Sequence, residues 1–287
     1  MTYICKYPFL TFPKMMKTIG FFSKLRCYKY YKEQKQQQQQ AKLEQQMIAA
    51  ADAVISDNEW AVSPFLSNEN AQKFHFIRLP IKKQFQQEQW RQEAAKENTL
   101  FCIAGRSGLK GIHQVIEAAH QLKEYIPDFR ILIPGNISSK KPAFLFEPPY
   151  LEYLRALIRT YGLEKNIRFL GQLSTEGMIS YMKEARVFLM PSAIENESST
   201  LREAMFLGMP VITGYAGDIF ETVSHGENGL IYRFEEHEML AFFVRKLLKA
   251  PSYAAQLGEN GGASIRKLYE NHNYGKSLLE VYDTVKR

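Results

Sequence analysis

The sequence contains little cysteine and no long apolar run. Only three cysteines occur in 287 residues, and the wide spacing of Cys5, Cys27 and Cys102 excludes a disulfide scaffold and a CxxC zinc site. No segment approaches the roughly 18–20 apolar residues of a membrane span. The N-terminus also lacks the apolar core of a signal peptide. The sequence therefore predicts a protein of the cytoplasm, a reducing compartment.

The excess of positive charge is confined to one end of the chain. The sequence carries 37 Lys+Arg against 30 Asp+Glu, a net charge of +7. Residues 1–50 hold nine basic and two acidic side chains, which account for the whole excess. A protein that is neutral elsewhere does not have a nucleic-acid-binding body, so no nucleic acid is expected as a partner. One basic surface element is expected instead.

That basic element is predicted to be a single helix over about 14–50. No proline occurs between Lys14 and Pro64, and the glutamine-rich residues 34–46 are good helix formers. In such a helix several lysines share one face (Lys14, Lys17, Lys24, Lys32 and Lys35), beside a short apolar stripe (Met15, Ile19 and Phe22). The face suits peripheral contact with an anionic membrane surface, a lipid-linked acceptor or a partner chain. A solvated helix face is the alternative.

Strands and helices alternate after residue 50. Short strands are predicted at 53–55 and 74–77, and a polar stretch then leads to a regular alternation. Its strands fall at 100–104, 129–133, 167–170, 187–190, 210–213 and 229–232, and its helices at 110–124, 149–161, 175–184, 199–207, 218–224, 236–249 and from about Gly262 to the C-terminus. This pattern predicts an α/β fold with a parallel sheet covered on both faces. Ligands of such sheets bind beyond the carboxyl ends of the strands.

A turn with two glycines follows the first strand of this unit. It reads Gly105-Arg106-Ser107-Gly108-Leu109-Lys110-Gly111, and it opens a helix whose first N–H groups are free to meet an anion. Arg106 and Lys110 add two cations, a combination that suits a diphosphate. The turn is neither GxGxxG nor a P-loop, which disfavours an NAD-dependent dehydrogenase. A glycine turn with solvated charges is the alternative.

A second polar segment follows the fourth strand and contains two glutamates. Glu195 precedes the predicted helix and Glu203 lies about one turn inside it. Between them, Ser198, Ser199 and Thr200 can cap the helix and leave backbone N–H groups for an anion. One interpretation is a capped helix with an acidic loop. The other is a ribose site in which a helical glutamate accepts hydrogen bonds from hydroxyl groups.

The order and spacing of several short motifs resemble a known family. These are Gly-Arg…Lys-Gly at 105–111, Phe169-Leu170-Gly171, Pro191-Ser192, the Glu195/Glu203 pair, Glu203-Ala204-Met205 with Gly208-Met209-Pro210-Val211-Ile212, and Gly226-Glu227-Asn228-Gly229-Leu230. Together they resemble the donor-binding domain of retaining glycosyltransferases of the GT-B fold, family 4 (glycosyl transferases group 1). The resemblance begins near Ala51 and is strongest over 100–233.

The resemblance implies a GT-B type α/β fold with one complete Rossmann-like domain. Residues 1–83 would be a shortened, largely helical acceptor-side domain, and residues 84–98 a linker. Residues 99–287 would form the nucleotide-sugar donor-binding domain, with the last helix packing back toward the N-terminal part. The implied reaction moves a sugar from a UDP- or GDP-sugar, with retention, to a saccharide or lipid-linked acceptor. It requires no metal and no other cofactor.

The resemblance also implies roles for individual residues. Arg106 and Lys110 would neutralise the diphosphate as it leaves, Glu195 would face the donor sugar, and Glu203 would bind the ribose hydroxyls. The remaining donor-binding positions are Gly105, the backbone around Ser198, Ser199 and Thr200, and the backbone near Leu173, which would meet the base. The family usually has Gly-Phe-Gly after the first glutamate, where this chain has Asn196-Glu197-Ser198. Glu197 beside a phosphate is unfavourable unless its carboxylate points away.

The part before the linker departs further from the family. It holds only two recognisable strands, and the family's glycine-rich loop and acceptor-side histidine have no counterpart in it. His75 lies in an apolar strand and is expected to be structural. An alternative function therefore stays open, namely an incomplete or non-catalytic chain that binds nucleotide-sugar and needs a partner for activity.

Overall fold

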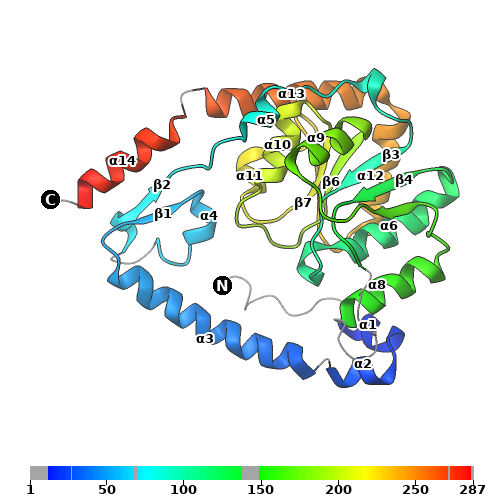
Figure 1. The fold of residues 1–287 in the computed structure, drawn as a ribbon, viewed down its shortest axis with the longest axis horizontal. Coiled ribbons are helices and arrows are strands. Elements are labelled where there is room, and N and C mark those ends of the chain that lie inside the picture. Colours follow the sequence, from blue (N-terminus) through cyan, green and yellow to red (C-terminus); the bar gives the residue numbers. More distant parts are fainter. Residues whose placement is uncertain (1–11, 27, 67–69, 138–148, 271, 286–287) are drawn as a thin grey trace.

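The structure is a computed structural model that describes residues 12–26, 28–66, 70–137, 149–270 and 272–285 (Figure 1). It contains two parallel sheets, one of six strands and one of two. The strands of the large sheet are β3 (Thr99–Cys102), β4 (Arg130–Ile133), β5 (Ile167–Phe169), β6 (Val187–Met190), β7 (Val211–Gly214) and β8 (Leu230–Tyr232). They are arranged in the order β5-β4-β3-β6-β7-β8. The α/β fold predicted from the sequence is confirmed.

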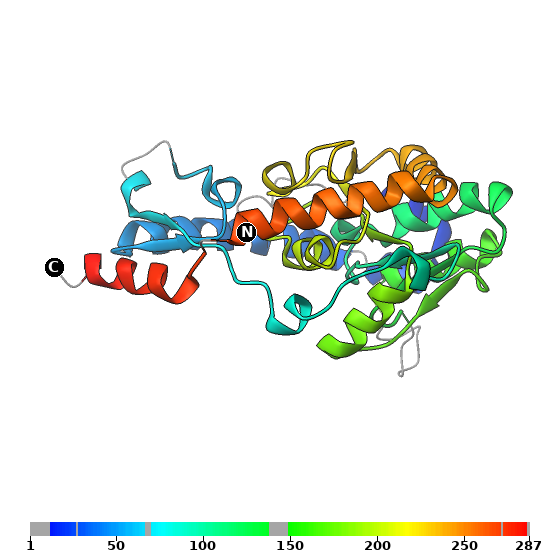
Figure 2. The ribbon, with the colours of Figure 1, turned by 90° about the horizontal axis from the view of Figure 1, so that it is seen from above.

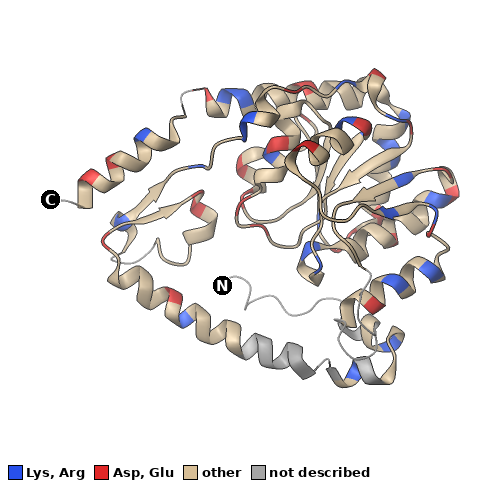
Figure 3. Ribbon diagram, in the orientation of Figure 1, with Lys and Arg blue, Asp and Glu red and all other residues tan. Residues whose placement is uncertain are grey.

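Helices cover both faces of the large sheet. One face carries α6 (Ile112–Tyr125), α8 (Pro149–Thr160) and α12 (His237–Lys249), and the other carries α9 (Thr175–Glu184), α10 (Ser199–Leu207) and α13 (Pro251–Tyr269). The short α11 (Ile219–Thr222) follows β7. Figure 3 shows that positive and negative residues are interspersed over these helices.

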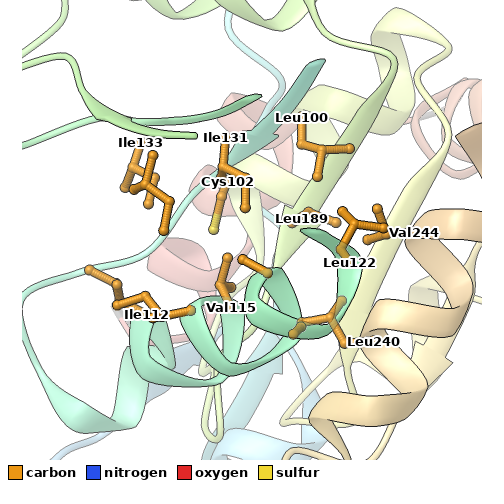
Figure 4. Close-up of a cluster of buried hydrophobic side chains, with 14 of the residues drawn as sticks. Leu100, Cys102, Ile112, Val115, Leu122, Ile131, Ile133, Leu189, Leu240 and Val244 are labelled. Atoms are coloured by element: carbon orange, nitrogen blue, oxygen red, sulfur yellow. The ribbon is translucent and has the colours of Figure 1, made fainter. Parts of the chain in front are cut away.

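The strands of the large sheet are apolar on both faces because each face is buried. In β3, Leu100 and Cys102 face α6 and α12, whereas Phe101 belongs to the core on the opposite face. Figure 4 shows the first of these cores, in which Val115 of α6 and Leu240 of α12 lie below the sheet. Continuous apolar strands of this kind are typical of parallel sheets.

The small sheet pairs β1 (Val54–Ser56) with β2 (Phe74–Phe76), in register Val54 to Phe74. Between the strands lie α4 (Glu59–Val62) and a short 3₁₀ turn over Ala71–Lys73. The small sheet has a core of its own, formed by Ile48, Val62, Phe65 and Phe74. The chain then passes through α5 (Lys83–Gln86) and further 3₁₀ turns at Gln92–Ala94 and Gly108–Lys110.

The N-terminal residues form three helices, so the single helix predicted over 14–50 is wrong. They are α1 (Phe12–Thr18), α2 (Phe21–Arg26) and α3 (Tyr28–Ala50). The chain leaves the helical path at Ile19 and Gly20, where the N–H of Gly20 donates to the Glu152 carboxylate of α8 at 2.8 Å. This break interrupts the continuous helical spacing on which the shared lysine face was predicted. The side chains of Lys14, Lys32 and Lys35, like Cys5 and Cys27, lie outside the described residues.

The C-terminal region also differs from the prediction, which placed one helix from about Gly262. Instead α13 begins at Pro251, a residue favoured in the first helical turn, and α14 (Tyr274–Val285) is separate. Helix α14 lies beside the small sheet, as Figures 1 and 2 both show. The Tyr269 hydroxyl donates to the carbonyl oxygen of Leu79 at 3.0 Å, which joins α13 to the segment after β2. No described helix is long and apolar enough to span a membrane.

Candidate functional site

The candidate site lies where the order of the large sheet changes direction. From β3, the chain builds β4 and β5 toward one edge, and then returns to place β6, β7 and β8 on the other side of β3. Parallel sheets of this kind bind ligands beyond the carboxyl ends of the strands at the point of reversal. The loops after β3, β6 and β7 meet there, since these three strands are neighbours.

Glycines allow the three loops to pack backbone against backbone. Gly111 has a φ of +74°, and a Cβ at this position would lie 1.9 Å from the carbonyl oxygen of Pro191. Gly217 has a φ of +58°, and its Cβ would lie 1.6 Å from the carbonyl oxygen of Glu195. Each glycine is therefore required both by its left-handed backbone and by the close approach. The site residues are held by three loops that support one another.

The first pair of site residues is an ion pair. The Lys110 Nζ lies 2.7 Å from the Glu195 Oε1, and the Glu195 side chain is 10% exposed. Gly105 packs against the stem of Lys110, because a Cβ there would lie 3.0 Å from the Lys110 Cγ. Arg106 is exposed in the same turn. The structure thus brings Gly105, Lys110 and Glu195 together.

Glu203 lies on α10 and forms an ion pair with Lys82. Its carboxylate is 3.0 Å from the Lys82 Nζ, and it is 5% exposed while the lysine side chain is 58% exposed. Burial raises the pKa of Glu203, and the nearby ammonium of Lys82 opposes this shift. Sequence analysis missed Lys82 because it lies in a polar stretch whose approach to α10 depends on the tertiary fold.

The beginning of α10 differs in detail from the predicted cap. Ser198 is the N-cap residue, but its hydroxyl donates to the Asp218 Oδ2 at 3.0 Å instead of capping the helix. Ser199 is exposed and Thr200 is half-buried. The Asp218 carboxylate is buried, and burial raises its pKa to about 6. Negative charge at this end of a helix is stabilised by the free N–H groups of its first turn.

Arg202 connects this helix to the small sheet. The guanidinium is 1% exposed and lies 2.7 Å from Asp57, 3.4 Å from Glu197 and 3.9 Å from Asp218. It also donates to the Tyr269 hydroxyl at 3.2 Å. Burial lowers the pKa of Arg202, but the hydrogen bond to Asp57 and the charges of Tyr269, Asp57 and Asp218 together outweigh this effect, and the net shift is upward. Arg202 is therefore a charged group shared by three carboxylates.

Glu197, which stands where the family usually has phenylalanine, forms an ion pair with Arg202. The Glu197 carboxylate is directed toward the Arg202 guanidinium. Burial raises the pKa of Glu197, the Asp57 charge adds to this, and Arg202 opposes it. Asp57 gave no signal in the sequence, because its position beside Arg202 depends on contacts between distant segments.

Leu173 lies apart from the other site residues. It is half-buried in the loop after β5, which is three strands from β6 in the sheet. At a strand spacing of about 4.8 Å, β5 and β6 are therefore about 14 Å apart across the sheet. The predicted residues therefore form two groups along one edge of the sheet, with Leu173 at one end and the lysine–glutamate pairs at the other.

Known proteins share this chain's sequence features and fold. The family model for glycosyl transferases group 1 matches residues 84–263. A GDP-mannose-dependent alpha-(1-6)-phosphatidylinositol monomannoside mannosyltransferase of Mycobacterium tuberculosis is 26% identical over 170 residues, or 57% of this chain and 41% of that protein. The mannosylfructose-phosphate synthase of Agrobacterium fabrum is 25% identical over 195 residues, 67% of this chain and 42% of that protein. The chain thus spans less than half the length of these relatives.

Solved structures show the same architecture. Sucrose-phosphate synthase from Thermosynechococcus elongatus superposes with a TM-score of 0.69 at 23% identity, covering 85% of this chain and 60% of that one. Anabaena HepE, solved in complex with UDP and glucose, gives a TM-score of 0.68 at 20% identity, covering 82% of this chain and 63% of that one. The fold is therefore of the GT-B type. The family model covers more than half of the sequence, so the chain belongs to the glycosyl transferases group 1 family.

Proposed function

We propose that the chain binds a nucleotide-diphosphate sugar and acts as a retaining glycosyltransferase toward a saccharide or lipid-linked acceptor. The observation that carries the proposal is the Lys110–Glu195 ion pair at the point where the large sheet reverses. It places a cation and a carboxylate 2.7 Å apart, and the turn that carries Lys110 also carries the exposed Arg106. A diphosphate needs the cations, and a sugar needs a hydrogen-bond acceptor.

In the proposed reaction, Arg106 and Lys110 stabilise the charge that develops on the departing diphosphate. The bond between the sugar C1 and the diphosphate oxygen breaks, and a bond from C1 to the acceptor hydroxyl forms on the same face. The hydroxyl proton leaves with the diphosphate. Glu195 orients the sugar through its hydroxyl groups and is not required to act as a nucleophile. Because side chains supply the positive charge, the proposal includes no metal and no other cofactor.

The nucleoside is expected to lie along the carboxyl edge of the sheet. Glu203 accepts hydrogen bonds from the ribose hydroxyls, and the largely exposed Lys82 exchanges its partner when the donor binds. The backbone of Ser198, Ser199 and Thr200 faces phosphate or sugar oxygens. The base lies toward Leu173, whose separation from β6 leaves room for a nucleotide.

The alternative is a chain that binds nucleotide-sugar but needs a partner for transfer. The small sheet favours this reading, since two strands are few for the acceptor side of such an enzyme. Both readings require the same donor site. They differ in whether the purified chain transfers or hydrolyses sugar.

Calorimetry with UDP and GDP tests the donor site directly. Lys110→Ala and Glu203→Ala should each weaken the binding of the preferred nucleotide about ten-fold or more, because a hydrogen bond to a charged group contributes about 1.5–3 kcal/mol. Lys165→Ala and Glu235→Ala are matched controls on exposed positions outside the site, and they should leave affinity unchanged. Absence of nucleotide binding would reject both readings. Transfer or donor hydrolysis by the purified chain would then distinguish them.

A further inference from the structure

A cavity lies between α3 and the small sheet and extends to the loop between β6 and α10. Its volume is about 700 Å³, which is in the range of small-molecule sites. Most of its lining is apolar, including Met47 and Ile48 of α3, Val54 of β1, and Val62, Phe65 and Ile77 nearby. The cavity reaches from the small sheet to the large sheet with its covering helices (residues 99–269, the large-sheet part). Acceptor and donor would have to meet between these two parts.

One end of this cavity is polar and adjoins the candidate site. Asn196 and Glu197 line it, and they directly follow Glu195 in the chain. Asp57 lines the same end. The Asn58 side-chain amide donates to the carbonyl oxygen of Asn196, which fixes the small sheet against this loop. An apolar ligand in the cavity would therefore present its polar end beside the carboxylate proposed to hold the donor sugar.

The charge of the lining limits what can bind. Among the described lining residues, the charged ones are Glu44, Asp57 and Glu197, and none is lysine or arginine. Carboxylates accept hydrogen bonds from hydroxyl groups, and side-chain amides both accept from them and donate to them. Carboxylates repel a phosphate. The cavity thus combines an apolar body with an end suited to a neutral, hydroxyl-rich group.

Exposed apolar side chains of α3 lie where the cavity opens to solvent. Met47 is 72% exposed and Leu43 is 56% exposed, and both are neighbours along one side of α3 and line the cavity. Clustered exposed apolar side chains beside a cavity indicate a ligand-binding surface. An acyl or other hydrocarbon tail entering here would cover them.

We propose that this cavity binds the hydrocarbon part of an uncharged glycolipid-like acceptor, with its hydroxyl-bearing head at Asn196 and Glu197. The proposal rests on the proposed transferase function and narrows its acceptor class. A free saccharide would leave the apolar lining uncovered, and an acceptor phosphate at the polar end would meet Asp57 and Glu197, two carboxylates that share a single guanidinium with Asp218.

Calorimetry on the full chain with three small probes tests this assignment. Octyl glucoside, below its micelle concentration, has a tail and a neutral head, octyl phosphate has the same tail with an anionic head, and glucose has no tail. We expect octyl glucoside to bind at least ten-fold more tightly than octyl phosphate, and glucose to give no measurable heat. Equal binding of the two octyl compounds would overturn the assignment of a neutral head, and absence of octyl glucoside binding would overturn the proposal.

Variants separate the cavity from general detergent binding. Met47→Glu places a charge at the entrance on an exposed position, so it should fold and weaken octyl glucoside binding five-fold or more. Gln46→Glu makes the same charge change on the preceding residue of α3, which is exposed and does not line the cavity. This variant should bind octyl glucoside as tightly as the unmodified chain. Ala61→Phe fills the cavity from α4 and should also weaken binding. Unchanged affinity in both Met47→Glu and Ala61→Phe would reject the proposal.

The same protein samples distinguish this inference from the proposed function. Nucleotide affinity is measured on Met47→Glu and should equal that of the unmodified chain, because Met47 lies outside the donor site. Nucleotide binding without glycoside binding would remove only the acceptor assignment. Glycoside binding without nucleotide binding would remove the transferase proposal and leave a lipid-like ligand site.

Discussion

At the scale of single residues, Arg202 has the largest structural role in the site. It is buried, it is positive, and it faces Asp57, Glu197 and Asp218. Removing one partner from a buried ionic cluster leaves charges without compensation, which is more harmful than replacing the whole cluster by apolar groups. The cluster also holds the Glu197 carboxylate against Arg202.

We predict that Arg202→Met lowers the free energy of unfolding by about 3–5 kcal/mol at pH 8. Arg233→Met is the control, since Arg233 is 76% exposed and its surface ion pair contributes at most about 1 kcal/mol. Urea denaturation followed by circular dichroism measures both. A loss below about 1 kcal/mol for Arg202→Met would show that the cluster tolerates its own negative charge.

The loss in the free energy of unfolding caused by Arg202→Met (the Arg202→Met deficit) should depend on pH. Burial already raises the pKa of Asp218 to about 6, and loss of the cation raises it further. A carboxyl group with a raised folded-state pKa contributes stability at low pH and loses it as the pH rises through that pKa. The deficit relative to the unmodified chain should therefore grow from pH 5 to pH 8, and a constant deficit would contradict this account.

Sequence reasoning located the site residues that follow strands, but it missed the residues that reach the site from elsewhere. Lys110 and Glu195 could be singled out because each follows a strand, where ligands of parallel sheets bind, although their pairing is seen only in the structure. Lys82 and Asp57 could not, since they precede the large sheet and approach α10 only through tertiary packing. Arg202 sits inside a helix pattern, where the sequence indicated only a helix.

At the scale of elements, the loops of the site depend on glycines at two points of contact. Gly217 adopts a left-handed conformation and approaches the Glu195 carbonyl oxygen more closely than any side chain permits. Gly226 adopts a similar conformation, with a φ of +82°, but a Cβ there would meet nothing within 4 Å. The two positions separate backbone strain from steric displacement.

We predict that Gly217→Ala weakens nucleotide binding by at least ten-fold, because the loop that carries Glu195 must move. Gly226→Ala incurs only the left-handed backbone cost, about 1–2 kcal/mol of stability, and should retain nucleotide affinity. Calorimetry and thermal denaturation of the two variants check this. Equal nucleotide affinities would show that the Glu195 loop is not positioned by this contact.

The elements of the large sheet were predictable, whereas the terminal helices were not. Buried parallel strands have short apolar runs that end at turns, so 187–190 and the helices at 175–184 and 199–207 agree with β6, α9 and α10. In α13, glycines near the predicted helix start at Gly262 lie inside the helix and have a packing role. A Cβ at Gly258 would lie 2.2 Å from the carbonyl oxygen of Gly208, and one at Gly261 would lie 3.0 Å from that of Asn228.

At the scale of the whole molecule, polar contacts join the large-sheet part to the small sheet and to the segment that follows β2. These include Arg202 to Asp57, Arg78 to Glu221 at 3.1 Å, and Lys82 to Glu203. Polar interfaces of this kind permit relative movement of two parts. The N-terminal helices are different, because α1 packs into the core of the large-sheet part while α3 leads to the small sheet.

We predict that Met15→Ala lowers the free energy of unfolding of the large-sheet part by about 2–5 kcal/mol, since Met15 is fully buried in its core. Met47→Ala, at a position 72% exposed on α3, should change it by less than about 0.5 kcal/mol. Denaturation in a Trp60→Phe background, followed by the fluorescence of Trp90 in the core of the large-sheet part, reports the difference. A Met15→Ala value near zero would mean that α1 adds nothing to that core.

The contacts that the end of α13 and the residues just after it make with the segment after β2 also constrain the order in which the chain can assemble. His272 lies 2.6 Å from the carbonyl oxygen of Arg78, a partner 194 positions earlier in the chain, and Tyr269 reaches back 190 positions to Leu79. During synthesis on the ribosome, these contacts cannot form until almost the entire chain has emerged. Contacts of such long sequence separation form slowly because closing a long loop costs entropy. The surface of the small sheet beside which α14 lies therefore stays uncovered until the end of the chain has been synthesised.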